Sequence, residues 1–179
     1  KKIALKIRRT DSPRKDMFAE PTLLQAANKA KVGPKLIASS KNFVAMEYLD
    51  GIKIYDWVSG LKGKGSAGKL KSLIKKVLTD CYNLDELGLD HGELSNITKH
   101  VIVGKKITLI DFESASMERR ASNVTSASQA ILIGSGLAKI VNRIYKLPPK
   151  QKIISVLREY KEHRTKDSFD KVLEALKLA

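Results

Sequence analysis

The chain has 179 residues, with 34 Lys and Arg against 19 Asp and Glu, so its formal net charge is +15. A hydrophobic share of 42% is enough to bury a core at this length, which excludes an intrinsically disordered chain. The length fits one domain or two small units that share a cleft. The single cysteine excludes an intramolecular disulfide. The sequence contains no run of about 18 apolar residues, so it predicts no membrane-spanning helix. We expect a cytoplasmic protein.

The positive charge predicts polyanionic partners, such as RNA, ribonucleoprotein, acidic surfaces or phosphorylated small molecules. The basic residues are scattered in pairs, among them Lys1-Lys2 and Arg119-Arg120, and only 6% of the residues are aromatic. This pattern favours solvated helix faces over a dedicated nucleic-acid surface. Association with RNA therefore stays an open expectation.

The first fifty residues predict a small, mostly β unit. Residues 1–9 alternate as in a strand, with Ile3, Leu5 and Ile7 on one face and Lys6 on the other. A polar link over residues 10–15 leads to an amphipathic helix that stops at Gly33-Pro34 and carries Glu20 in its first turns. Short strands are expected at 36–38 and 43–48, followed by a turn at Asp50-Gly51.

The remainder predicts a mostly helical unit. Its clearest helix runs from about Ala67 to Leu87, with Cys81 on the apolar stripe and Gly88 at the end. A loop is expected over 91–99, then a β-hairpin formed by 101–103 and 107–110. Three amphipathic helices should follow, over Val124–Tyr145, Lys150–His163 and Ser168–Leu178, the last capped by Asp167.

The segment Gly63–Lys69 fits a glycine-rich phosphate-binding pattern, but its context argues against that function. A P-loop needs a buried strand before it and Ser or Thr after the lysine, and Leu70 occupies that position here. We therefore expect a basic loop in front of a helix.

Two short acidic motifs carry a stronger signal. His91-Gly92-Glu93-Leu94 follows the long helix, and Ile110-Asp111-Phe112-Glu113 follows the hairpin. We expect the two carboxylates that leave these elements, Glu93 and Asp111, to converge at one point. Converging carboxylates of this kind can bind a divalent metal ion.

Together with Lys6 on an upstream strand and Glu20 on the next helix, these motifs resemble the protein-kinase-like fold. Ile3-Ala4-Leu5-Lys6 is similar to the V-A-I-K strand, and Met46-Glu47-Tyr48-Leu49 to the hinge between the lobes. The 91–95 and 111–113 segments are similar to the catalytic loop and the D-F-G motif of its atypical branch. The RIO kinases, the archaeal kinase of the KEOPS complex and the lipopolysaccharide core heptose kinases resemble the chain most.

The resemblance implies an α+β, two-lobed fold, with a small N-lobe over residues 1–50 and a minimal helical C-lobe over 51–179. It implies an ATP- and Mg2+-dependent kinase that transfers the γ-phosphate to a hydroxyl of a protein or small molecule, most similar to a small atypical serine/threonine-protein kinase. Lys6 would hold the α- and β-phosphates, and Glu20 would fix the Lys6 rotamer through an ion pair. Met46, Glu47 and Leu49 would bind adenine. Asp111 would bind the metal, and Glu93 would orient the attacking hydroxyl.

The chain departs from the family pattern at several positions. Glu93 replaces the usual Asp, and Glu113 replaces the Gly of D-F-G. The glycine-rich loop of the family would lie upstream of Lys6, where this sequence has only five residues. Three residues are candidates for the second metal ligand: His100, Thr98 and Asn96. Of these we favour His100. These departures keep an alternative open, a non-catalytic pseudokinase scaffold that binds nucleotide and a polyanionic or protein partner.

Overall fold

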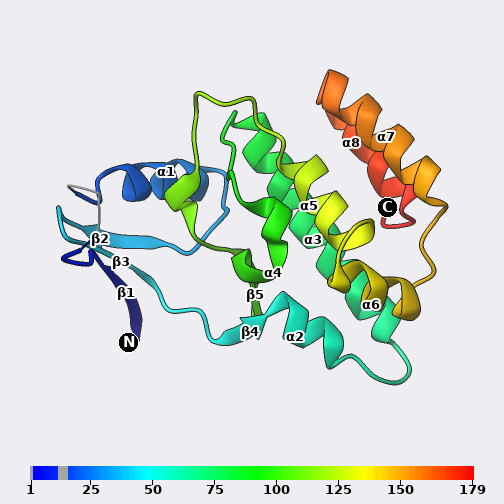
Figure 1. Cartoon of the computed structure of the whole chain (residues 1–179), viewed down its shortest axis with the longest axis horizontal. Coiled ribbons are helices and arrows are strands. Elements are labelled where there is room, and N and C mark those ends of the chain that lie inside the picture. Colours follow the sequence, from blue (N-terminus) through cyan, green and yellow to red (C-terminus); the bar gives the residue numbers. More distant parts are fainter. Residues whose placement is uncertain (1, 12–15) are drawn as a thin grey trace.

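The structure is a computed structural model that describes residues 2–11 and 16–179. It has the expected α+β composition, with small antiparallel sheets and a majority of helices. A sheet and one helix form the N-terminal part, and the remaining helices pack mainly on one another, with a second small sheet at the edge of this helical part (Figure 1). The candidate site residues lie where these two parts meet.

The N-terminal sheet contains β1 (Ile3–Ile7), β2 (Leu36–Ser39) and β3 (Phe43–Glu47). Its order is β1-β3-β2, with both pairs antiparallel, which confirms the three predicted strands. Helix α1 (Ala19–Lys29) follows β1 and buries Glu20 and Leu24. Part of the predicted polar link, residues 12–15, lies outside the described residues.

Strand β1 exposes its apolar face to solvent and directs the face that carries Lys6 toward the helical part. Ile3, Leu5 and Ile7 are at least half exposed, at 51%, 53% and 64%, although they form the apolar face. Ala4 and Lys6, on the opposite face, line an open cavity. The alternation of the strand therefore places a lysine, and not its isoleucines, at the meeting of the two parts.

The second sheet has the order β4-β5-β6, with β4 (Gly51–Lys53), β5 (Val101–Gly104) and β6 (Ile107–Leu109). The hairpin β5–β6 confirms the prediction. The predicted turn at Asp50-Gly51 leads straight into β4, which pairs antiparallel with β5. β4 has only three residues and its partner β5 is distant in the sequence, so neither a period nor a hairpin signal could predict it.

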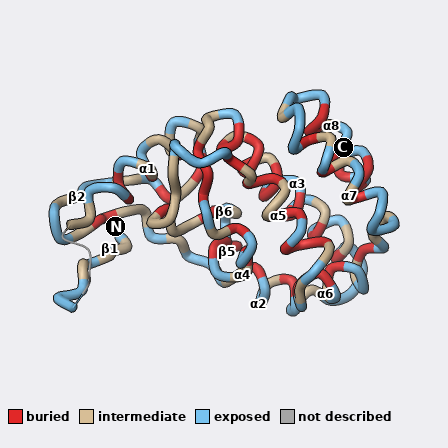
Figure 2. The backbone as a smooth tube through the Cα atoms, turned by 45° about the horizontal axis from the view of Figure 1, so that its top comes forward, coloured by how far each residue is buried: buried red, intermediate tan, exposed pale blue. Residues whose placement is uncertain are grey.

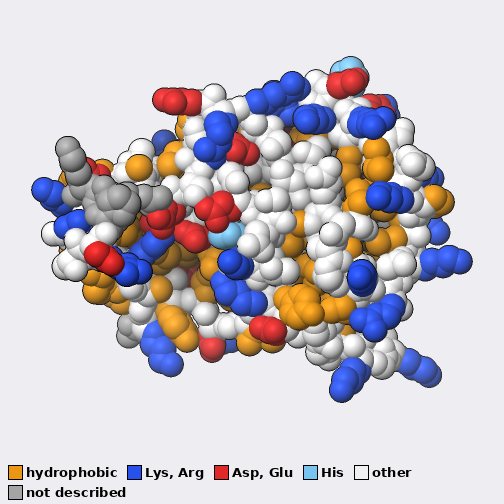
Figure 3. Space-filling model, in the orientation of Figure 1, with side chains coloured by type: hydrophobic (Ala, Val, Ile, Leu, Met, Phe, Trp, Pro, Cys, Tyr) orange, Lys and Arg blue, Asp and Glu red, His pale blue; other side chains and the backbone are white. Residues whose placement is uncertain are grey.

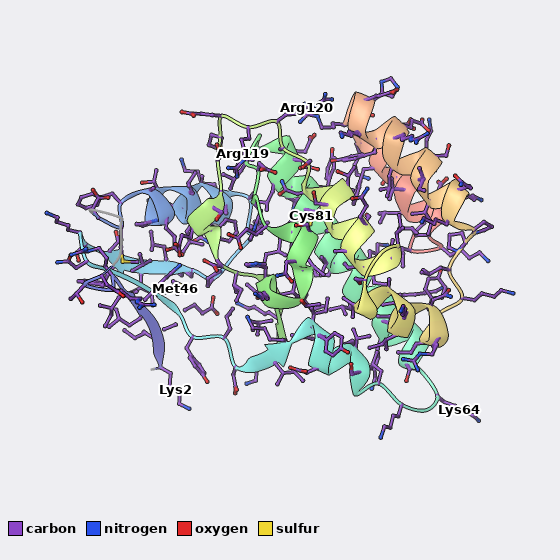
Figure 4. All side chains as sticks on the ribbon, viewed as in Figure 1. Lys2, Met46, Lys64, Cys81, Arg119 and Arg120 are labelled. Carbon is purple, nitrogen blue, oxygen red and sulfur yellow. The ribbon has the colours of Figure 1, made fainter. Side chains whose placement is uncertain are left out.

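Helix α3 (Ser66–Glu86) is the central helix of the C-terminal part, and its predicted apolar stripe is buried. The buried segments of the tube in Figure 2 concentrate along it and its neighbours. Cys81 is fully buried on α3 as expected (Figure 4). The short helix α2 (Ile54–Ser59) precedes it.

The C-terminal helices differ from the prediction in two places. The single helix expected over 124–145 is two helices, α5 (Asn123–Leu132) and α6 (Gly136–Ile144), bent by 71°. The break falls at Gly134, and Ser135 caps α6 through the N–H of Ala138. Helix α7 (Lys150–His163) is as predicted, but Thr165, not Asp167, caps α8 (Lys166–Ala175).

No single helix among the described residues is long and apolar enough to cross a membrane; only α5 and α6, counted together across their bend, meet both criteria.

The loop expected over 91–99 contains two short helices, η1 (Leu94–Asn96) and α4 (Ile97–His100). A third short helix, η2 (Phe112–Ser114), follows β6.

Phe112 is buried and joins the two parts of the molecule, because α1 packs directly on it. A Cβ atom at Gly33 would lie 2.9 Å from both Leu24 Cδ1 and Phe112 Cε2, so only glycine fits there. The ring of His91 also packs on Phe112, with ring centroids 5.0 Å apart.

A buried polar network anchors the segment before Glu93. The carboxylate of Asp85, on α3, accepts hydrogen bonds from the backbone N–H and side-chain amide of Asn123, the N–H of Val124 and the hydroxyl of Tyr160. Asn123 Oδ1 in turn accepts the N–H of His91, at 2.8 Å. Burial raises the pKa of Asp85, although these hydrogen bonds act in the opposite direction.

We expect Asp85→Ala to lower the free energy of unfolding by about 3 kcal/mol or more, because several buried donors lose their acceptor. Urea denaturation measures the change. Asp170→Ala, which removes an exposed pair with Lys166 on α8, is the control and should cost less than about 1 kcal/mol. Equal losses in the two variants would show that the Asp85 network contributes no more to the free energy of unfolding than an exposed ion pair does.

Candidate functional site

Lys6 lies at the centre of an ion cluster formed by three carboxylates. Its Nζ atom is 2.9 Å from Glu20 Oε2, 3.1 Å from Asp111 Oδ1 and 2.5 Å from Glu113 Oε2. The predicted ion pair between Lys6 and Glu20 is therefore present. Figure 3 shows acidic side chains gathered beside a histidine where the sheet meets the helical part.

The cluster shifts the pKa values of its members. Burial acts to lower the pKa of Lys6, but its hydrogen bonds with Glu113 and Glu20 outweigh this and raise that pKa above its ordinary value. Burial raises the pKa of Glu20 against the effect of Lys6. For Asp111, burial is outweighed by the hydrogen bond and charge of Lys6, so the pKa of this carboxyl falls below its usual range. Lys6 is thus a charged group engaged by three carboxylates, and Asp111 stays ionised.

The backbone around Asp111 is held in an unusual conformation. Asp111 has φ 72° and ψ 75°, in the left-handed region that non-glycine residues seldom occupy. His91 fixes the residue before it, because Nε2 donates to the carbonyl of Ile110 at 3.0 Å. Burial lowers the pKa of His91, which keeps this ring neutral at pH 7. Strained backbone of this kind is typical of functional sites.

Glu93, His100 and Asp111 form a group that could hold a metal ion, with one possible ligand atom of each within 4.8 Å of the others. His100 is only 3% exposed. Its Nε2 lies 3.0 Å from Glu93 Oε2 and its Nδ1 lies 4.0 Å from Asp111 Oδ2, yet neither nitrogen has a hydrogen bond of good geometry with the described residues. A buried imidazole without such a bond fits a metal ligand.

Of the three residues left open as second ligand, His100 is the one in this group. Thr98 donates its hydroxyl to Asn96 Oδ1 at 3.1 Å, so those two side chains contact each other. The two carboxylates suit Mg2+, whereas an imidazole suits Mn2+ and related transition metals better. The donor set therefore accepts Mg2+ and is expected to prefer Mn2+.

A cavity of about 360 Å³ adjoins the cluster, within the range of about 300–1,000 Å³ that is usual for small-molecule sites. Lys6, Glu20 and Asp111 line one end. The rest is lined by Ala4, Pro34, Met46, Glu47, Tyr48, Leu49, Ile102 and Ile110. Every predicted binding residue of the N-terminal part therefore borders one cavity, and Asp111 connects it with Glu93 and His100.

Two residues of the site were not predicted. Glu113 was noted only as a replacement for glycine, but its carboxylate binds Lys6. Ser114 donates a hydrogen bond from its hydroxyl to Glu93 Oε1. Their position directly after Asp111 is the only sequence signal that could have found them.

The glycine-rich segment over 63–69 lies away from this cavity. It connects α2 with α3, so a helix and not a buried strand precedes it, as the sequence context led us to expect. Lys64 and Met46 lie at opposite ends of the molecule in Figure 4.

A larger hollow of about 910 Å³ lies between α3 and the β5–β6 hairpin. Its lining includes five lysines: Lys31, Lys69, Lys76, Lys105 and Lys106. Two of them have acidic partners there, since Lys76 binds Asp80 and Lys106 lies 3.4 Å from Glu47. The expected association with a polyanion such as RNA stays a prediction.

No protein-family model matches the chain. Over 97 residues it is 31% identical to the uncharacterized protein MJ1211 of Methanocaldococcus jannaschii, and this alignment covers 54% of the chain and 79% of that protein. The name of that protein states no activity, so function has to be argued from the geometry of the site.

We expect the chain to bind Mn2+ more tightly than Mg2+ in the absence of nucleotide, because His100 supplies a nitrogen donor. His100→Ala should weaken Mn2+ binding by about tenfold or more, measured by electron paramagnetic resonance of the free ion. His163→Ala, at the exposed end of α7, is the matched control. Unchanged Mn2+ affinity in His100→Ala would contradict the assignment.

Proposed function

The chain belongs to the same family as this archaeal protein, and from its cleft we propose that it is an ATP-dependent phosphotransferase with a two-lobed, protein-kinase-like fold. The acceptor is a hydroxyl, and a small serine/threonine-protein kinase is the activity that we favour. In this assignment residues 1–50 are the N-lobe and residues 51–179 the C-lobe.

The observation that carries the proposal is the convergence of Lys6, Glu20 and Asp111 at one end of a largely apolar cavity. These residues come from three separate segments of the chain, β1, α1 and the end of the hairpin. Phosphoryl transfer requires positioned positive charge and metal-binding carboxylates beside a nucleotide site. A cluster with only a structural purpose has no need of the adjoining cavity.

We assign the base of ATP to the apolar end of the cavity. Met46 and Leu49 would pack on the adenine ring, and the carbonyl of Glu47 with the N–H of Leu49 would bind its edge. The triphosphate would then extend toward Lys6. Because Glu20 is 6% exposed and lies 2.9 Å from Lys6, it would fix the lysine rotamer.

At the reacting end, Asp111 and His100 would hold the metal ion, which supplies neutralising charge for the phosphates. Lys6 binds the α- and β-phosphates. Glu93 accepts a hydrogen bond from the acceptor hydroxyl and takes its proton late in the reaction. Glu93 has one methylene more than the usual Asp, but its contact with His100 Nε2, at 3.0 Å, holds the longer side chain in a defined place.

The non-catalytic scaffold is a second candidate, and one observation favours it. Lys6 is already bound by three carboxylates, and Glu93 already accepts the hydroxyl of Ser114. Both groups would have to exchange these partners during catalysis. A scaffold would bind nucleotide in the same cavity without transfer, so transfer assays separate the two functions.

We expect ATP with Mg2+ or Mn2+ to raise the melting temperature, and labelled phosphate to pass to a protein acceptor. Asp111→Asn should abolish transfer, because it removes the metal-binding carboxylate. Glu93→Gln should lower the rate by about a hundredfold while nucleotide affinity, measured by calorimetry, is unchanged. Stabilisation by nucleotide without any transfer would support the scaffold; no nucleotide binding would overturn both functions.

Glu113 is expected to weaken nucleotide binding, because its carboxylate occupies Lys6 and repels the phosphates. Glu113→Gln should therefore tighten binding of ADP in the presence of a metal chelator, by about tenfold. Glu118→Gln, on an exposed segment nearby, is the control for net charge. Weaker ADP binding in Glu113→Gln would instead make Glu113 part of the nucleotide site.

A further inference from the structure

Ser114 places a hydroxyl of the chain itself on the carboxylate that we assign to the acceptor. Its Oγ donates to Glu93 Oε1, which is the contact that an acceptor hydroxyl makes before transfer. Ser114 is half-buried and lies three residues after Asp111, at the end of η2. The hydroxyl thus contacts the carboxylate assigned as base, and this carboxylate lies within 4.8 Å of Asp111, which is assigned to the metal.

The backbone of Ser114 is held against the segment that carries Glu93. Arg119 donates a hydrogen bond from Nη2 to the Ser114 carbonyl, and its Nε is fixed by Asp90 Oδ2 at 2.9 Å. Two backbone hydrogen bonds between Asp90 and Ser116, at 2.9 and 2.8 Å, close the same segment. A Cβ atom at Gly92 would lie 2.5 Å from the Ser114 carbonyl oxygen, so glycine permits this approach.

The neighbouring hydroxyl of Ser116 is used differently. Its Oγ accepts hydrogen bonds from the backbone N–H groups of Glu118 and Arg119, at 3.1 and 3.3 Å, and so caps a local turn. Two serines of one segment therefore have distinct environments. Ser114 contacts the carboxylate of the site, and Ser116 provides a matched control.

We propose that Ser114 is the phosphoryl acceptor of an intramolecular self-phosphorylation, an inference that rests on the proposed function. Ser114 Oγ attacks the γ-phosphorus of ATP, and a new Oγ–P bond forms. The bond from the γ-phosphorus to the β,γ-bridging oxygen breaks, and ADP leaves with that electron pair. The hydroxyl proton passes to Glu93 and then to water. The products are phosphoserine, ADP and a proton.

Close positioning makes the intramolecular reaction efficient, because acceptor and base are already in contact. The product carries about two negative charges at pH 7 beside Glu93 and Asp111, so repulsion will drive phosphoserine away from them. The nearest cation in the described contacts of Ser114 is Arg119. Phosphorylation is therefore expected to release Ser114 from Glu93.

The test incubates the whole chain with labelled ATP and Mg2+ or Mn2+, first alone and then with an added protein acceptor such as casein. Peptide mass spectrometry should locate the phosphate on Ser114. The rate per molecule should be constant over a hundredfold dilution, because the reaction is intramolecular. Ser114→Ala should lose at least tenfold of the self-label, Ser114→Thr should regain part of it, and Ser116→Ala should match the wild type.

Transfer to casein separates this role from a positioning role. If Ser114 is the acceptor, Ser114→Ala loses the self-label by a much larger factor than it loses transfer to casein. If both fall in parallel, Ser114 only orients Glu93 and the proposal is overturned. A self-label on other residues, or a rate that rises with protein concentration, also overturns it. Transfer to casein without self-label refutes Ser114 alone, whereas nucleotide binding with neither reaction refutes the proposed function as well.

Discussion

The packing of Phe112 against α1 and His91 is the constraint on which the site depends. Asp111 and Glu113 are the direct neighbours of Phe112, so fixing this ring fixes two of the carboxylates around Lys6. Gly33 and Leu24 close the same contact from α1, the helix that carries Glu20. One apolar contact therefore sets the spacing of charges that come from distant parts of the chain. The carboxylates around Lys6 keep their relative positions because the packing of Phe112 against α1 is close.

The site is locally acidic in a protein whose net charge is +15. Lys6 cannot neutralise Glu20, Asp111 and Glu113 together, and Glu93 lies close by. An anionic nucleotide is attracted by the molecule as a whole but repelled at the cleft unless a cation accompanies it. The overall charge and the local charge thus have opposite effects, and together they favour a metal–nucleotide complex over the free nucleotide.

The sequence predicted β1 and α3 from their periods, β2 and β3 as short apolar runs, and the β5–β6 hairpin from two apolar runs around a glycine turn. It also predicted which residues meet at the cleft, since the motifs around Lys6, Glu20, Glu93 and Asp111 carry their order with them. It could not predict β4, the bend at Gly134 or the cap of α8, which depend on short segments and tertiary contacts. Glu113 and Ser114 were missed as site residues because their roles arise from neighbours 107 and 21 positions away.

The left-handed backbone conformation of Asp111 lowers the stability of the folded state. A non-glycine residue in that region costs about 1 kcal/mol, and the carboxylate is also close to two others. Glycine at position 111 would relieve the backbone and remove one of the like charges. The backbone conformation therefore favours glycine at position 111, whereas the ion pair with Lys6 and the chemistry of the site favour a carboxylate.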